Sequence, residues 1–65
     1  MVTLRILDAS GRLVKTLVHE IREPGWYTVH WDGRDNRGHP VPGGTYFYSI
    51  AAGEFRATRK ATLIR

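Results

Sequence analysis

The residues that come nearest to a ligand-binding set lie in a long loop in the middle of the chain. Asp32, Asp35 and Asn36 carry carboxylate and amide oxygens, which Ca²⁺ prefers as ligands. In an EF-hand loop such ligands stand at alternate positions with glycine at the sixth, whereas here Arg34 and Arg37 interrupt the cluster. Aspartate and asparagine also stabilise turns through their own side chains. The spacing therefore favours turn residues, and we expect neither a metal nor a cofactor.

The histidines and serines do not form a recognisable metal or catalytic set. His19, His30 and His39 are scattered, and structural zinc sites need four ligands, usually including the thiolates that this cysteine-free chain lacks. Ser10 is expected in a turn and Ser49 within a strand, without a G-x-S-x-G elbow around either. We therefore expect no catalytic residues, no enzymatic activity and no small-molecule substrate.

Two short motifs suggest functions that their surroundings do not support. The dipeptide Trp31-Asp32 occurs in WD repeats, but a propeller needs several blades of about 40 residues each. The glycine-rich stretch Gly38–Thr45 contains no lysine for a phosphate-binding loop. Neither motif changes the expectation of a non-catalytic domain.

The basic charge balance leaves a nucleic-acid hypothesis open. Ten basic residues against six acidic ones give a net charge of +4, which favours an anionic partner. The basic residues are dispersed, with local density only at Arg56, Arg59 and Lys60, which is typical of a solvated strand face. The alternative is a small basic β-barrel that stacks single-stranded nucleic acid on Trp26 and Phe47. We do not expect nucleic acid to be the main partner.

The 65 residues are predicted to form one domain, residues 1–65, or part of a larger protein. A chain of this size buries only about 60% of its unfolded surface, and without cysteine it has no disulfide to compensate. No apolar run approaches the roughly 20 residues of a membrane span. No signal-peptide pattern is visible.

Alternation of apolar and polar residues predicts an all-β domain without helices or internal repeats. The five predicted strands span residues 2–7, 13–19, 26–31, 45–52 and 55–64. The first two strands and the last two should form antiparallel hairpins. The predicted core consists of Leu4, Ile6, Val14, Val29, Trp31, Tyr46, Tyr48, Ile50 and Leu63.

The first hairpin has the sequence of a type I turn at Asp8–Gly11, with glycine continuing into a G1 bulge. A regular ladder from that turn would place Ile6 opposite Val14 and Leu4 opposite Thr16.

The second hairpin has Gly53-Glu54, which suits a two-residue type II′ turn. That turn places Ala61 opposite Tyr46 and Arg59 opposite Tyr48. An inward Arg59 would have to stack on Tyr48 at the rim, unless a bulge shifts the register.

The chain resembles a FlgD Ig-like domain in the segments LRILDASGRLVKTL, GWYTVHWDGRDNRGHPVPGGTYFYSI and RATRKATLIR. The most specific part is LD..G..V..L followed by W.G.D..G..V..G.Y.Y. By this resemblance the framework positions are Ile6, Gly11, Val14, Leu17, Trp31, Gly33, Gly38, Gly44, Tyr46 and Tyr48. Such domains end the flagellar hook-capping protein and many large secreted bacterial proteins, and are similar to the C-terminal sorting domains of type IX secretion.

The resemblance implies a small immunoglobulin-like antiparallel β-sandwich. It also implies a non-catalytic accessory module of an extracytoplasmic bacterial protein, which acts by anchoring, capping or sorting. Family members usually carry a further strand before the segment that matches residues 2–7, so we expect this chain to lack it.

The pattern also suggests a contact surface for a protein partner or a second copy of the chain. In the regular register the outer face of the first hairpin collects three leucines, and contiguous exposed apolar surface commonly marks an interface. A homo-oligomer is therefore expected, through this face or through the unpaired edge of the hairpin. The residues predicted to bind a partner are Leu7, Leu13, Leu17, Trp26 and Phe47.

Overall fold

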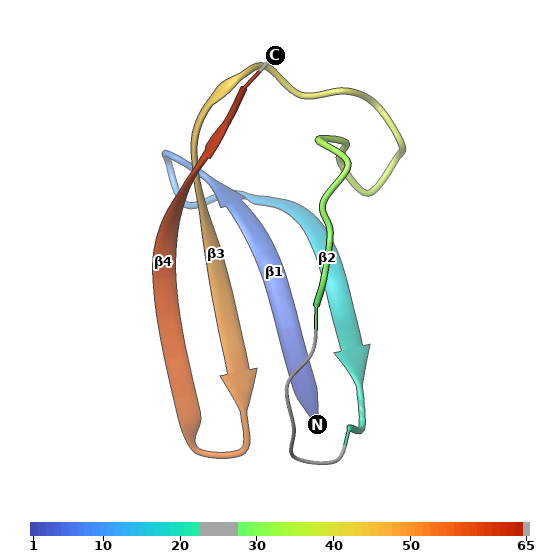
Figure 1. Ribbon diagram of the computed structural model, residues 1–65, viewed down its shortest axis with the longest axis vertical. Helices are drawn as coiled ribbons and strands as arrows, with labels where there is room; N and C mark the ends of the chain where they lie inside the picture. Colours follow the sequence, from blue (N-terminus) through green and yellow to red (C-terminus); the bar gives the residue numbers. More distant parts are fainter. Residues whose placement is uncertain (23–27, 65) are drawn as a thin grey trace.

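The computed structural model describes residues 1–22 and 28–64, which form a single antiparallel sheet and no helix (Figure 1). The strands are β1 (Val2–Asp8), β2 (Leu13–Glu20), β3 (Gly44–Ala52) and β4 (Phe55–Leu63). Their order across the sheet is β2-β1-β3-β4, so β2 and β4 form its edges. The predicted all-β class and both predicted hairpins are confirmed.

The turn between β1 and β2 forms as its sequence predicts. The Gly11 amide donates to the Asp8 carbonyl at 3.0 Å, and the Asp8 amide donates to the Arg12 carbonyl at 2.9 Å. Gly11 has a φ of +87°, in the left-handed region that glycine enters without steric cost. This is a type I turn followed by a bulged glycine.

The pairing of β1 with β2 contains two irregularities that the predicted register lacks. The first skips Val14, which was predicted opposite Ile6. The second skips Leu17, so that Leu4 lies opposite Val18, two positions from its predicted partner. Each bulge inserts one extra residue on β2, and the alternation of residue types does not reveal such an insertion. The predicted register of this hairpin therefore holds for the pair next to the turn, Leu7 and Leu13, and is wrong from Ile6 onward.

The pairing of β3 with β4 is regular and matches the prediction. Tyr46 lies opposite Ala61 and Tyr48 lies opposite Arg59, with no bulge along the ladder. Gly53 has a φ of +61°, and no residue other than glycine has a positive φ among those described. These angles identify a type II′ turn. The Arg59 side chain is exposed, so the sheet accommodates it without a register shift.

The predicted third strand is not found in its described part. Residues 26 and 27 lie outside the described residues, and residues 28–31 belong to no strand. They run across one face of the sheet, here called the inner face (Figure 1). Val29 and Trp31 line a cavity together with Ile6 of β1. An alternating pattern indicates a half-buried extended chain, but a strand also needs a neighbour that shares its backbone hydrogen bonds.

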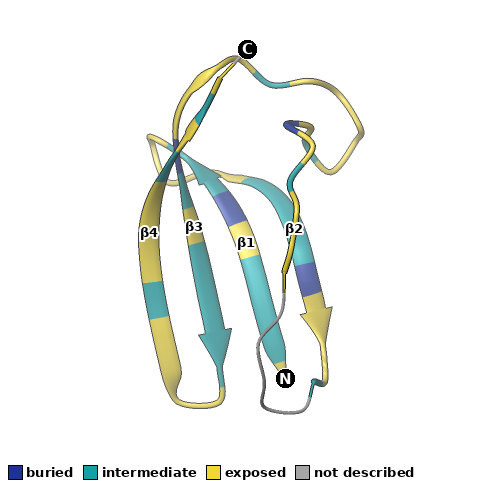
Figure 2. Cartoon of the chain, in the orientation of Figure 1, coloured by how far each residue is buried: buried dark blue, intermediate teal, exposed yellow. Residues whose placement is uncertain are grey.

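The core of the described residues is small because, among them, only this segment and the adjoining loop cover the inner face. Among the described residues, the buried hydrophobic side chains are Ile6, Val18 and Tyr46 (Figure 2). The Trp31 ring meets the Tyr46 ring edge-on, with centroids 5.1 Å apart. Other members of the predicted core are half-buried, namely Leu4, Val14, Trp31, Ile50 and Leu63. Val29 and Tyr48 were predicted in the core but are each 37% exposed, because they lie at the margin of this narrow cover.

Candidate functional site

The sheet face opposite the core, called the outer face, carries an apolar row across three strands. Leu7 of β1 lies between Leu13 of β2 and Phe47 of β3, as the direct cross-strand partner of both. Directly paired residues project from the same face of a sheet. Leu13 is 51% exposed, and the other two are half-buried. We call Leu13, Leu7 and Phe47 the outer row; it ends at Lys60 on β4.

The neighbouring positions on the outer face are polar. The next set of cross-strand partners consists of Arg5, Thr16, Ser49 and Thr58. The outer row is therefore an apolar band beside a polar surface. It unites three of the five residues that were predicted to bind a partner.

The two other predicted partner-binding residues do not join this row. Leu17 was predicted on the outer face but lines the inner cavity, of about 230 Å³, with Leu4 and Trp31. The reason is the first bulge, at Val14, which shifts the alternation along β2 so that Thr16 pairs on the outer face and Leu17 faces inward. Trp26 lies outside the described residues.

At the turn between β1 and β2, an aspartate side chain organises the backbone. Asp8 Oδ1 accepts hydrogen bonds from the amides of Ser10 and Arg12, both at 2.9 Å, and from the Ser10 hydroxyl at 2.7 Å. The Ser10 hydroxyl bond is the largest cause that lowers the pKa of Asp8. The carboxylate thus acts as a charged acceptor that closes the turn.

The middle loop repeats this construction. Asp35 Oδ1 accepts from the amides of Arg37 and His39, both at 2.9 Å, and the Gly38 amide donates to the Asp35 carbonyl at 3.0 Å. Gly38 has a φ of +85°, close to that of its counterpart in the first turn. The bond from the His39 amide is the largest cause that lowers the pKa of Asp35.

The two turns share a sequence signal, DASGRLV and DNRGHPV, in which aspartate, glycine and valine recur at the same spacing. This short repeat was missed because a search for internal repeats looks for whole structural units. The matched hydrogen bonds show that the spacing encodes one turn used twice.

The middle loop is anchored on the edge strand β2. The Asn36 amide donates to the Val14 carbonyl at 3.0 Å, and Asn36 Oδ1 accepts from the Thr16 amide at 3.1 Å. Asn36 thereby pairs with β2 beside its first bulge, in the place where a neighbouring strand would bond. The edge of the first hairpin, which was expected to stay open, is covered at this point.

These contacts confirm that Asp32 and Asp35 of the loop serve as turn residues, whereas the Asn36 side chain binds the edge strand β2. Asp32 Oδ1 accepts from the Arg34 amide at 3.0 Å, while Asp35 and Asn36 accept the bonds described above. Within residues 1–22 and 28–64, no three acidic, histidine or cysteine side chains gather closely enough to hold a metal. His19 contacts the Thr3 hydroxyl at 3.2 Å on the outer face.

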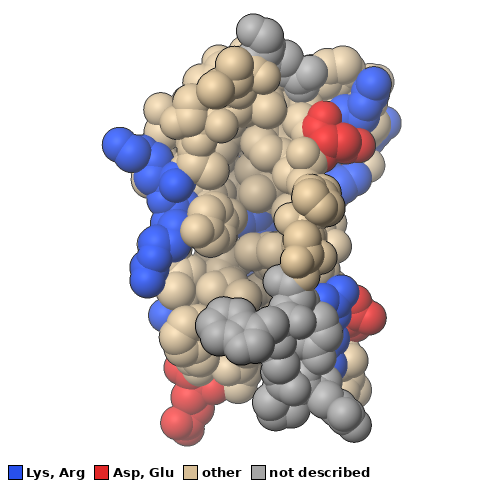
Figure 3. Space-filling view, in the orientation of Figure 1, with Lys and Arg blue, Asp and Glu red and all other residues tan. Residues whose placement is uncertain are grey.

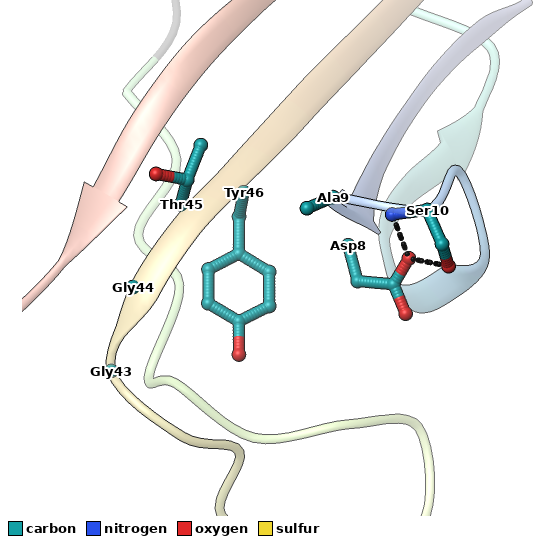
Figure 4. A pocket seen from close by; sticks show the side chains of 7 residues that line it. All are labelled: Asp8, Ala9, Ser10, Gly43, Gly44, Thr45 and Tyr46. Carbon is teal, nitrogen blue, oxygen red and sulfur yellow. Dashed lines mark hydrogen bonds between the residues drawn. The ribbon is translucent and has the colours of Figure 1, made fainter.

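A shallow hollow of about 330 Å³ opens beside the first turn (Figure 4). It is lined by Asp8, Ala9, Ser10, Gly43, Gly44, Thr45 and Tyr46. The Asp8 carboxylate is engaged by Ser10, and the Tyr46 hydroxyl donates to the Pro42 carbonyl. The polar groups of the hollow therefore hold the turn and the loop together rather than pairing a nucleophile with a base.

The order of turns and aromatic residues along the chain matches that of a known domain family. Residues 1–54 match the family model of the FlgD Ig-like domain. The chain belongs to the FlgD Ig-like domain family. Two curated relatives, both called basal-body rod modification protein FlgD, come from Salmonella typhimurium and Salmonella typhi. Each is 44% identical over 52 residues, which cover 78% of this chain but 22% of the relative.

This FlgD Ig-like domain thus spans about a fifth of the length of the curated relatives that it matches. No solved structure matches it. In the described part of the domain, no helix is long and apolar enough to cross a membrane.

Proposed function

We propose that the domain is a non-catalytic protein-interaction module of an extracytoplasmic bacterial protein. It would act by anchoring, capping or sorting, through contact of the outer row with a protein partner or with a second copy of itself. Membership of the FlgD Ig-like family and the name of the curated relatives support this assignment.

The observation that carries the proposal is the outer row itself. Leu13, Leu7 and Phe47 form a continuous apolar band, although the domain has only three buried hydrophobic residues among those described. A half-exposed leucine and a half-buried phenylalanine would contribute more to stability inside a core. Their position on the outer face is explained if a second surface covers them.

Light scattering of the domain at tens of micromolar tests self-contact through the row. We expect concentration-dependent association, and Leu13→Glu should abolish it because it places a charge in the band. Thr28→Glu is the matched control, since Thr28 is exposed and belongs to the segment that crosses the opposite, inner face. A monomer at all concentrations, with a urea midpoint that Leu13→Glu leaves unchanged, would contradict self-contact through this row.

Binding of single-stranded nucleic acid is the second candidate function. The observation in its favour is that Phe47 and Lys60 are cross-strand partners on the outer face, so an aromatic ring adjoins a cation. The predicted barrel is not formed by the described strands, because β2 and β4 lie at opposite edges of one open sheet.

A further inference from the structure

The two edges of the sheet differ in how far the chain covers them. On β2, Asn36 bonds to the backbone beside the first bulge. On β4, every residue pairs with β3, and no described backbone group pairs with its other side. The β4 edge also has neither a bulge nor a proline, two devices that protect edge strands. It is a long, regular and open edge.

The turn geometry identifies the backbone groups that face outward from β4. In a hairpin with a two-residue turn, the pair that flanks the turn, Ala52 and Phe55, shares its hydrogen bonds, and such pairs then alternate. The residues that direct their amide and carbonyl groups away from β3 are Arg56, Thr58, Lys60 and Thr62. One contact agrees with this, because the Arg59 guanidinium donates to the Thr58 carbonyl at 3.1 Å.

Positive charge accompanies this edge on both faces. Arg56 and Lys60 are partners of outer-face residues, whereas Arg59 is the partner of Tyr48 on the inner face. All three are exposed, and none forms an ion pair with a carboxylate of the described residues. Figure 3 shows basic side chains along the β4 side of the molecule.

These charges select among possible strand partners. Two antiparallel copies of β4 would bring cations of both chains to one narrow edge, and like charges in opposing strands are destabilising. An acidic strand would meet the same cations with opposite charge, while its backbone occupied the outward amides and carbonyls. Strand addition of this kind takes affinity from the backbone and specificity from alternate side chains.

We propose that the β4 edge binds an extended acidic segment of another protein as an added antiparallel strand. Its carboxylates pair with Arg56 and Lys60 on the outer face and with Arg59 on the inner face. The Arg59 guanidinium releases the Thr58 carbonyl, which then accepts an amide of the incoming strand. This surface and its partner chemistry are distinct from the outer row and do not depend on it.

The test uses the fluorescein-labelled peptide TVEEVTEVT, whose glutamates match Lys60, Arg59 and Arg56 in antiparallel register. Fluorescence anisotropy should show saturable binding that Arg59→Gln with Lys60→Gln weakens by about tenfold or more, as expected when charge-assisted bonds are lost. The control is Arg34→Gln with Arg37→Gln, which also removes two positive charges but from the middle loop away from β4. Leu13→Glu should leave peptide binding unchanged, which separates this proposal from the outer row.

Thr58→Pro distinguishes strand addition from simple charge attraction. It removes one outward amide and leaves all three cations, and proline is tolerated at such edge positions. We expect peptide binding to be lost while the circular dichroism spectrum is kept. If the variant unfolds, a peptide N-methylated at alternate residues makes the same test on the intact domain and should not bind.

Three results would overturn the proposal. The first is absence of peptide binding, and the second is equal binding of the N-methylated peptide. The third is displacement of the peptide by oligothymidine that binds more tightly and is insensitive to Thr58→Pro, which would assign the edge to nucleic acid.

Discussion

At the scale of single residues, Asp8 and Asp35 hold the two turns that shape the domain. Each carboxylate accepts two backbone amides, from the second and fourth residues after it. The residue types predicted turn formation, because aspartate favours these local bonds. The two bonds of Asn36 to β2 were not predictable in the same way, since they join residues about 20 positions apart along the chain.

The stability of the domain should therefore fall in acid through these two aspartates. Hydrogen bonds to the charged form lower both pKa values in the folded state, with the Ser10 hydroxyl as the largest cause at Asp8 and the His39 amide at Asp35. The two ionised carboxylates stabilise the fold above the pKa of an unfolded aspartate, about 3.9. This stabilisation is lost as the pH falls through their lower pKa values in the folded state. The urea midpoint measured from about pH 5 to about pH 2.5 reports this loss.

The double variant Asp8→Asn with Asp35→Asn should have a lower midpoint at pH 5 and a weaker dependence on pH. Glu54→Gln, in the exposed turn before β4, is the control that removes a carboxylate elsewhere. Equal pH dependence in the wild type and the double variant would show that these aspartates are not responsible.

At the scale of elements, the hairpins were predictable because their turns are encoded locally. Asp8–Gly11 and Gly53-Glu54 each fix a turn type, and the second also fixes a register that holds along all of β4. The bulges at Val14 and Leu17 were not predictable, because alternation assumes one residue per position. For this reason Leu17 was predicted on the outer contact surface, whereas it lines the inner cavity.

Gly11 and Gly38 should respond alike to substitution, because both occupy the same position in the repeated turn. A Cβ atom would meet nothing within 4 Å at either site, so the cost of alanine comes from the left-handed backbone alone. We expect Gly→Ala to lower the free energy of unfolding by about 1–2 kcal/mol at each position. Gly→Asn should cost less, because asparagine tolerates this conformation.

Urea unfolding of the four single variants measures these costs. Ala9→Ser is the control, because it changes a residue in the first of these turns whose φ is not positive. An alanine variant as stable as the wild type would mean that the turn relaxes to a different conformation.

At the scale of the whole molecule, the domain is one sheet whose inner face is covered by a short segment. The aromatic alternation of residues 26–31 predicted a strand, but in the described part, residues 28–31, no strand forms and only Trp31 is half-buried. The sequence could not settle this, because pairing depends on whether a sheet edge is available nearby. The consequence is a thin second layer, in which Trp31 makes the aromatic contact with the sheet.

The last prediction is that folding of the whole domain depends on Trp31. Its ring meets Tyr46 at 5.1 Å, and its indole Nε1 donates to the Arg34 carbonyl at 2.9 Å, so it fixes both the covering segment and the loop. A core this small rarely provides more than about 3–5 kcal/mol. Truncation of a fully buried aromatic to alanine costs about 3–5 kcal/mol, and the half-buried Trp31 should lose a large part of that. Trp31→Ala should therefore show no cooperative urea transition, whereas Trp31→Phe, which loses the indole bond but keeps a ring, should still unfold cooperatively at a lower midpoint. If Trp31→Ala unfolds at the wild-type midpoint, residues 28–31 do not hold the inner face.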